Sequence, residues 1–146
     1  MAYEFYYRRL VHWQDTDLAG IIHYTNYFRY MDEAETEFYR SLGLHKLKDS
    51  SAEGVTCPRV SASCDFVSPA VFGDELDIHL WVAKKGRSSM VYEYSFKRAQ
   101  KAQEVAHGRV ICVFSERGRN GQLRSVAIPE RFDRVFQVAP FAIDST

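Results

Sequence analysis

The feature that most constrains the fold is a single change in hydrophobic period along the chain. Over residues 25–42 apolar side chains recur at spacings of three and four, at Tyr27, Met31, Ala34, Phe38 and Leu42. This spacing places them on one face of a helix. Thr25 or Asn26 is suited to cap its first turn, and Gly43 stands where a C-terminal cap glycine belongs. The sequence therefore predicts one long amphipathic helix over residues 25–42.

After residue 57 the apolar period becomes two, which is typical of strands that bury one face. The predicted strands are 60–66, 76–82, 91–96 and 105–114, with turns at Pro69, at 73–74, at 85–87 and at 117–121. A further strand is expected over residues 3–13, which are rich in aromatic residues together with Leu and Val, and a loop over 14–23. Residues 44–57 are polar and irregular, and Ile128-Pro129-Glu130 predicts a short terminal helix with Pro129 at its first position.

These elements predict a single α+β domain over residues 1–146. Short turns between strands indicate antiparallel neighbours, and a lone helix with an apolar stripe must bury that stripe against the sheet. The expected architecture is an antiparallel five-stranded sheet wrapped around one long central helix. Four apolar side chains are expected on the opposite face of the sheet: Trp81, Val91, Ile111 and Val113. A second copy of the chain covering that face, or pairing with an edge strand, would explain them, so a homodimer or homotetramer is expected.

Charge and cysteine content exclude several classes of protein. Lysine and arginine number 19 and so do aspartate and glutamate, which argues against a nucleic-acid binder. The three cysteines are an odd number without CxxC spacing, which favours reduced thiols and a cytoplasmic location. No stretch approaches the roughly 18 apolar residues of a membrane span, so none is expected.

The segment between the first predicted strand and the helix carries the most specific motif. It reads Asp15-Thr16-Asp17-Leu18-Ala19-Gly20-Ile21-Ile22-His23-Tyr24-Thr25-Asn26-Tyr27. Two aspartates one residue apart, a glycine, two apolar residues and an Asn-Tyr pair opening the helix resemble the signature of the 4-hydroxybenzoyl-CoA thioesterase family of hotdog-fold proteins. The likeness continues through residues 28–38, and weaker matches follow at 69–70, 73–76, 86–89 and 128–129, so the resemblance covers nearly the whole chain.

The resemblance implies a thioesterase that hydrolyses acyl-CoA to a free acid and CoA. It assigns the chemistry to Asp17, as nucleophile or as general base for water, and polarisation of the carbonyl to the backbone N–H of Tyr24. Physical chemistry agrees, because a helix N-terminus offers unpaired N–H donors to an oxyanion and Gly20 lets the backbone turn close to a substrate. Such chemistry requires no metal and no cofactor, since coenzyme A is part of the substrate.

Further residues near the motif have two interpretations each. Many family members place a histidine where this chain has Tyr24, so the preceding His23 either helps in the pocket or is a hydrogen-bonded structural residue. Asn26 either caps the helix or contacts the substrate. Tyr27 and Trp13 line either an acyl pocket or the core.

A basic hairpin is the second candidate binding element. Its polar side chains suit the phosphates of the CoA nucleotide, and the resemblance implies CoA contacts near this turn, at Lys85, Arg87, Ser88 and Ser89. Solvated surface is the alternative interpretation. A basic hairpin would equally suit an acidic acyl carrier protein, so the partner is either acyl-CoA or a carrier-bound acyl chain.

Other functions and other catalytic groups remain open at this level. The chain could be a non-catalytic acyl-binding module with the same fold. Asp17 could be a turn residue, and Asp15 is expected to be structural. Another hotdog branch uses a helix carboxylate as its base, a role open to Glu33, Glu35 or Glu37, which otherwise form a solvated face or subunit contacts.

Overall fold

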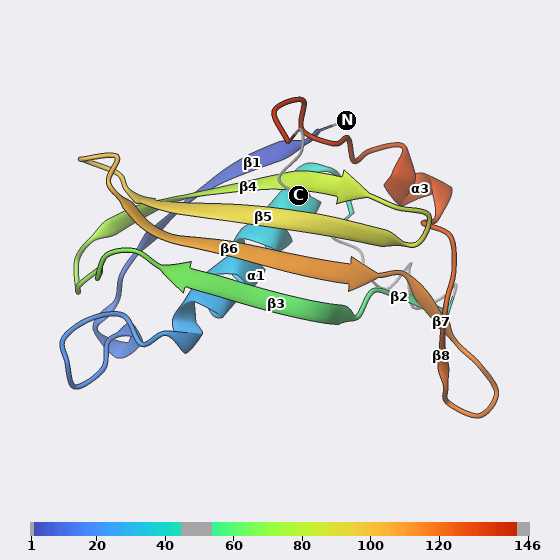
Figure 1. Ribbon diagram of the computed structural model, residues 1–146, viewed down its shortest axis with the longest axis horizontal. Coiled ribbons are helices and arrows are strands. Elements are labelled where there is room, and N and C mark those ends of the chain that lie inside the picture. Colours follow the sequence, from blue (N-terminus) through green and yellow to red (C-terminus); the bar gives the residue numbers. More distant parts are fainter. Residues whose placement is uncertain (1, 45–53, 143–146) are drawn as a thin grey trace.

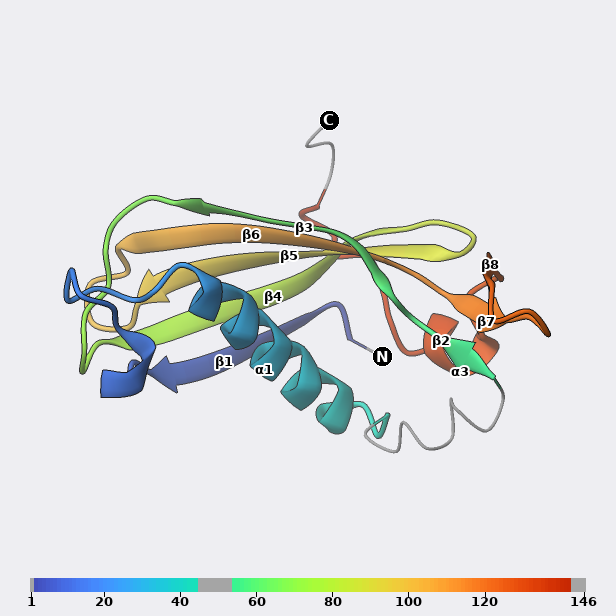
Figure 2. The same cartoon turned by 90° about the horizontal axis from the view of Figure 1, so that it is seen from below.

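A five-stranded antiparallel sheet and one helix dominate the computed structural model, which describes residues 2–44 and 54–142. The sheet order is β1-β4-β5-β6-β3, with bounds β1 (Glu4–Leu10), β3 (Arg59–Phe66), β4 (Glu75–Lys85), β5 (Ser89–Arg98) and β6 (Glu104–Val113). Helix α1 (Thr25–Ser41) lies across one face of this sheet (Figure 1 and Figure 2). The predicted α+β architecture and long helix are confirmed, while most of the predicted irregular segment lies outside the described residues.

The core lies between α1 and the sheet. The predicted stripe is buried, with Tyr27, Met31, Ala34 and Phe38 at most 4% exposed. It packs with the inward residues of β4 and β5, which are fully buried: Leu76, Ile78, Leu80, Val82, Tyr92, Tyr94 and Phe96. Gly108 on β6 lets α1 approach closely, because a Cβ at this position would collide with the Met31 side chain.

The first strand is shorter than the sequence predicts. It ends at Leu10, and Trp13–Asp15 form a single 3-10 turn, η1, in place of the expected strand end. The reason is local, because the backbone N–H of His12 donates to the Asp15 carboxylate at 3.0 Å instead of to a neighbouring strand. The prediction that residues 3–13 form one strand was therefore wrong beyond Leu10.

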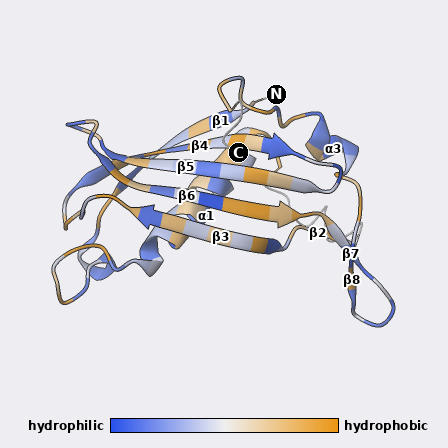
Figure 3. Cartoon of the chain, in the orientation of Figure 1, coloured by the Kyte–Doolittle hydropathy of each residue, from blue (hydrophilic) through white to orange (hydrophobic). Residues whose placement is uncertain are grey.

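A small second sheet and a short helix depart from expectation at the end of the main sheet near the β4–β5 turn. Strands β2 (Val55–Thr56), β7 (Ser115–Arg117) and β8 (Leu123–Ser125) form a small second sheet that the sequence did not predict. The hairpin between β7 and β8 is hydrophilic (Figure 3). Helix α3 (Glu130–Asp133) is present, but Pro129 precedes its first residue rather than occupying it. The helix is therefore displaced by one position from the predicted start.

The sheet face opposite α1 is partly covered by the chain itself. The C-terminal segment returns across this face (Figure 2), where Ala139 N–H donates to Val82 O at 2.9 Å and the Phe141 ring lies 5.8 Å from that of Trp81. Val91 is only 5% exposed. By contrast, the edge strand β3 leaves Val60 61% and Phe66 52% exposed. Among the described helices, none is long and apolar enough to cross a membrane.

Candidate active site

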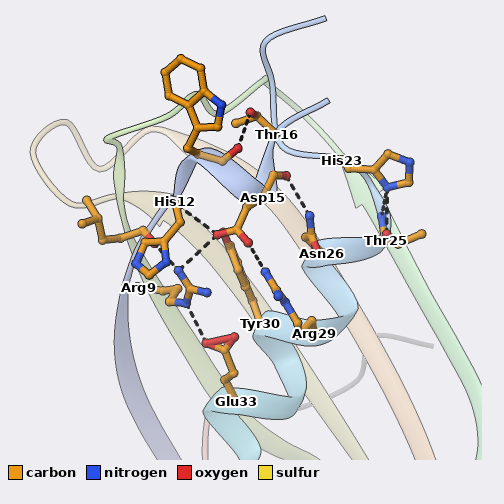
Figure 4. Close-up of polar contacts among 12 residues, drawn as sticks. Arg9, His12, Asp15, Thr16, His23, Thr25, Asn26, Arg29, Tyr30 and Glu33 are labelled. Atoms are coloured by element: carbon orange, nitrogen blue, oxygen red, sulfur yellow. Dashed lines mark hydrogen bonds and ion pairs between the residues drawn. The ribbon is translucent and has the colours of Figure 1, made fainter. Parts of the chain in front are cut away.

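The connection from β1 to α1 is built around the buried side chain of Asp15. Its carboxylate is fully buried, and Oδ2 accepts from Tyr30 Oη at 2.7 Å and His12 N at 3.0 Å, with Arg9 Nη1 3.3 Å away. Arg29 pairs with Oδ1. Figure 4 shows these donors converging on Asp15 from the strand, the loop and the helix. The first aspartate of the motif is thus a structural hub whose oxygens are all engaged.

The main chain of Asp15 holds the start of the helix as well. Its carbonyl oxygen accepts from His23 N at 2.9 Å and from Asn26 Nδ2 at 2.8 Å. One residue therefore binds the helix N-terminus through its side chain and through its backbone (Figure 4). Asn26 uses its amide nitrogen for this link, which places it as a brace between the loop and α1.

The charge of Asp15 is held by these contacts. Burial alone raises the pKa of a carboxyl, but the hydrogen bonds from Tyr30 and His12 N–H, with the Arg29 guanidinium, outweigh it and lower the pKa of Asp15. A chain of polar contacts extends the network, since Arg9 Nε donates to Glu33 Oε1 at 2.7 Å and Tyr7 Oη donates to the same oxygen at 2.9 Å. Asp15 is therefore an ionised, fixed carboxylate at neutral pH.

Asp17 has the opposite environment, at the corner of a tight turn. Gly20 N donates to Asp17 O at 3.0 Å, and Asp17 N donates to Ile21 O at 2.9 Å. Gly20 has φ +78, a conformation that L side chains rarely adopt, which explains why a glycine closes the turn. The exposed Asp17 side chain accepts only one protein hydrogen bond among the described residues, from Ala19 N at 2.8 Å. The second aspartate of the motif is therefore available to a ligand.

A cleft of about 530 Å³ lies against this turn and the helix start. We call it the Asp17 cleft, and it is lined by Asp17, Ile21, Ile22, Tyr24, Tyr27, Phe66, Val67, Ser68 and Pro69. A second hollow of about 650 Å³ also borders Asp17 and contains Trp13, Gly20 and Phe72. The structure thus brings Asp17, Tyr24 and Tyr27 to one cleft, with Gly20 and Trp13 beside it.

The backbone N–H of Tyr24 is unoccupied at the N-terminus of α1. Within residues 2–44 and 54–142 no protein acceptor receives it, whereas His23 N and Asn26 N are both hydrogen-bonded. His23 Nδ1 lies 2.8 Å from Thr25 Oγ1 and 3.3 Å from Thr25 N, so this ring caps the helix. His23 is not among the residues that line either hollow. The positive end of the helix dipole therefore carries a free N–H donor on a residue that lines the Asp17 cleft.

The basic hairpin does not join this site within one chain. It connects β4 to β5 at the end of the sheet opposite the β1–α1 loop (Figure 1). Lys85 Nζ is engaged there by Asp133 Oδ1 at 2.7 Å and by Phe136 O at 2.9 Å. Arg87 is exposed, while Ser88 and Ser89 are partly buried beside the turn.

Sequence reasoning missed two sets of residues around the site. Arg9, Arg29 and Tyr30 surround Asp15. Their only sequence signals are an arginine near the end of the first strand and an arginine and a tyrosine near the start of the helix. Phe66, Val67, Ser68 and Pro69 form the far wall of the Asp17 cleft, whereas the sequence marks Pro69 as a turn residue and a weak family match but not as part of a site. Of the helix carboxylates, Glu33 binds Arg9 and Tyr7 and Glu35 pairs with Arg59, and neither lines the Asp17 cleft.

Comparison with known proteins places this arrangement in a family. Residues 11–136 match the thioesterase-like superfamily. The chain belongs to that superfamily. A protein of Aquifex aeolicus (strain VF5) is 37% identical to this thioesterase-like chain over 124 residues, which cover 84% of this chain and 91% of the relative.

Two relatives of named activity share the sequence or the fold. A 1,4-dihydroxy-2-naphthoyl-CoA hydrolase of Synechocystis sp. is 29% identical over 111 residues, covering 75% of this chain and 80% of the relative. An aspartate-to-asparagine variant of 4-hydroxybenzoyl-CoA thioesterase, complexed with 4-hydroxybenzoyl-CoA, superposes with a TM-score of 0.82 and 27% identity, over 93% of this chain and 100% of the other. The predicted family, hotdog fold and enzyme class, an acyl-CoA thioesterase, are confirmed.

Proposed function

We propose that this enzyme hydrolyses an acyl-CoA thioester in the Asp17 cleft, with the Asp17 carboxylate as nucleophile or general base and the Tyr24 N–H as oxyanion donor. One observation carries the proposal: Asp17 and Tyr24 line the same cleft, and in the part of the chain that the structure describes the Tyr24 N–H has no protein acceptor. The Asp15 carboxylate is engaged by its own donors and takes no part in bond making.

The chemistry follows from these two groups. The thioester oxygen accepts the Tyr24 N–H, whose alignment with the helix dipole stabilises the negative charge that develops on it. Asp17 then either removes a proton from the water that attacks the carbonyl, or attacks directly to give an anhydride that water hydrolyses. In both courses the C–S bond breaks, the thiolate of CoA leaves, and the acyl group departs as a carboxylate.

The cleft walls favour a flat aromatic acyl group. Tyr24, Tyr27 and Phe66 contribute rings to the lining, and the Tyr27 ring lies 5.1 Å from that of Phe66. Burial raises the pKa of Tyr27 to about 12, so the neutral phenol persists well above neutral pH. The named activities of the two relatives concern hydroxylated aromatic acyl-CoA thioesters, and we propose the same substrate class here.

A second copy of the chain would bring the basic hairpin to the cleft. Strand β3 has one neighbour, β6, so its outer edge can pair with another β3. Antiparallel pairing about a two-fold axis places the Arg59 end of one copy, with its β4–β5 turn, beside the Phe66 end of the other, where the cleft opens. We propose a homodimer in which Arg87, Ser88 and Ser89 bind the CoA nucleotide across the interface; a homotetramer would pair two such dimers.

The proposal also covers the carrier of the acyl group and the cellular location of the enzyme. An acyl carrier protein is the alternative donor, since its acidic surface would meet the same basic hairpin. Cys57, Cys64 and Cys112 are free thiols, which fits a reducing cytoplasm.

Thiol release from a panel of aromatic, short, medium and long acyl-CoA thioesters tests the reaction. Asp17→Asn should lower kcat by about 100-fold to 10,000-fold while the fold is kept, because it removes the base or nucleophile. Asp77→Asn is the matched control, as Asp77 lies on β4 in a surface ion pair with Arg8. Wild-type kcat in Asp17→Asn would remove Asp17 from the mechanism, and a silent wild type on every CoA and carrier-linked thioester would leave an acyl-binding module.

The cross-subunit contact has its own test. Arg87→Ala should raise KM for an acyl-CoA but leave KM unchanged for the same acyl group on a truncated pantetheine thiol, because only the nucleotide reaches the hairpin. Sedimentation equilibrium gives the number of copies. A monomer with full activity would refute the dimeric site.

A further inference from the structure

Asp15 is the one fully buried carboxylate in the described chain that the proposed reaction leaves without a role. Burying a charge is costly unless it is paired and hydrogen-bonded, so such a group is retained for what it organises. Its donors come from three separate segments: Arg9 on β1, His12 N in the loop, and Arg29 with Tyr30 on α1. The carboxylate therefore locks strand, loop and helix against one another.

The two groups of the proposed reaction, the Asp17 carboxylate and the Tyr24 N–H, are only a few bonds away from atoms that Asp15 holds in place. Asp17 follows Asp15 by two residues, and Tyr24 follows His23, whose N–H is bonded to Asp15 O at 2.9 Å. Asn26 Nδ2 adds a second bond to the same carbonyl oxygen at 2.8 Å. No other described residue holds both the start of the turn and the first residues of the helix. Small shifts of Asp15 would thus change the placement of the Asp17 carboxylate relative to the Tyr24 N–H.

We infer that Asp15 is the positioning residue of the site, and that the bonds to its carboxylate and its carbonyl set the alignment of Asp17 with the Tyr24 N–H. This inference rests on the proposed function for its catalytic consequence, but its structural content can be measured without turnover. Correct alignment of reacting groups affects the chemical step far more than the binding of a substrate. The role predicts a loss in kcat with little change in KM in fully folded protein, because partial unfolding would also lower the apparent kcat by removing active enzyme.

The central variant is Asp15→Asn, which keeps the size of the side chain and removes its charge and one acceptor oxygen. We expect kcat to fall 10-fold to 100-fold with KM within about 3-fold of the wild type, at a temperature where the variant is fully folded. Val82→Ala controls for lost stability, because Val82 is a fully buried side chain near the far end of β4. Tyr7→Phe controls for the network, because the Tyr7 hydroxyl bonds only its outer member, Glu33. Both controls should keep kcat within about 3-fold.

Hydrogen exchange separates this inference from the proposed function. In Asp15→Asn the hydrogen-bonded amides of Asp17, Ile22 and His23 should exchange at least 10-fold faster, while those of β4 and β5 keep their rates. If the wild type hydrolyses no thioester, the proposed function fails, and the exchange pattern still decides whether Asp15 positions the loop. Equal acceleration across the sheet, or wild-type kcat in folded Asp15→Asn, would overturn the inference.

A second variant keeps the test decisive if Asp15→Asn does not fold. Asn26→Ala removes only the side-chain bond to Asp15 O and leaves the buried carboxylate with its donors. It should lower kcat at least 5-fold, leave KM nearly unchanged and accelerate exchange of the His23 amide, which donates to the same carbonyl oxygen. Unchanged kcat together with unchanged exchange at this amide would refute the role of the carbonyl link.

Discussion

Replacing Tyr30 with phenylalanine would remove a single atom from the network around Asp15. Tyr30 is fully buried, and its hydroxyl donates to Asp15 Oδ2 at 2.7 Å. The ring itself stays, with the Arg9 guanidinium 4.6 Å from its centroid. Tyr30→Phe therefore isolates the contribution of one hydrogen bond to a buried charge.

The size of the effect follows from the donors that remain. A hydrogen bond to a charged group contributes about 1.5–3 kcal/mol to the free energy of unfolding. In Tyr30→Phe, Asp15 Oδ2 keeps His12 N at 3.0 Å and Arg9 Nη1 at 3.3 Å, so it is not orphaned. We therefore expect a loss near the lower limit, about 1.5 kcal/mol at pH 7. The same loss raises the folded-state pKa of Asp15 in the variant, because the Tyr30 hydroxyl favours the ionised carboxylate.

The sign of the pH dependence is fixed by the pKa of Asp15. Burial raises this pKa, but the hydrogen bonds outweigh burial and lower it in the folded state. The carboxylate therefore contributes its full stability above its unfolded-state pKa, about 3.9, and loses it as pH falls through the folded-state value. The deficit of Tyr30→Phe should be full at pH 7 and shrink in acid, since the phenol favours the ionised carboxylate.

Urea unfolding followed by circular dichroism measures this deficit from pH 7 down to about pH 2, because the lowered pKa of Asp15 places the change in acid. Tyr94→Phe is the matched control, because Tyr94 is also fully buried but its hydroxyl lies 3.4 Å from Glu35 Oε2. At that distance the bond is weak, so the control should lose less than half as much as Tyr30→Phe. A Tyr30→Phe deficit below about 0.5 kcal/mol at pH 7, or one that stays constant with pH, would refute the reasoning.

Two further predictions concern the core and the second buried carboxylate. Gly108→Ala should lower the free energy of unfolding by about 1 kcal/mol, the lower end of the cost of overpacking, because the new methyl group displaces only the flexible end of the Met31 side chain. Combining it with Met31→Ala should cost less than the sum of the single variants, and an additive result would show that the two residues do not press on each other. Burial raises the pKa of Glu35 above its ordinary 4.5 despite Arg59, so its ionisation opposes folding increasingly as pH rises through that range. Glu35→Gln should therefore gain stability relative to the wild type between pH 4 and pH 7, and a relative loss over this range in urea titrations would contradict the pKa shift.

The fold could be predicted where a local pattern and its tertiary role agree. Met31 and Phe38 lie on a stripe that has one place to be buried, and the alternation from Leu76 to Val82 marks the inner face of β4. The first strand could not be bounded this way, since residues 11–13 have strand composition. It ends because the Asp15 carboxylate takes the His12 N–H, a contact that no propensity encodes.

The site also has a part that the sequence predicts and a part that only the tertiary structure reveals. Asp17, Gly20 and Tyr24 are close in sequence, so a motif can bring them together, and the structure places all three around one turn. The partners of Asp15 come from β1 and α1, and the cleft wall at Phe66 comes from β3. Such contacts depend on the helix height above the sheet. The position of Arg87 relative to Asp17 could not be predicted from the motif. It depends on the length of β4 and on whether a second copy of the chain pairs with β3.

The roles that we propose for the two aspartates differ because their surroundings differ. Asp15 points inward, where Tyr30, His12 N–H and two guanidinium groups hold it charged and still. Asp17 points outward from a turn that its own backbone closes, with Ala19 N as its single protein donor among the described residues. A carboxylate that must attack a carbonyl or take a proton needs free lone pairs, whereas one that must fix a loop needs all of them engaged. The two aspartates are therefore not expected to exchange these proposed roles. Moving either carboxylate by one residue should abolish its role, which is to anchor the loop for Asp15 and to carry the reaction for Asp17.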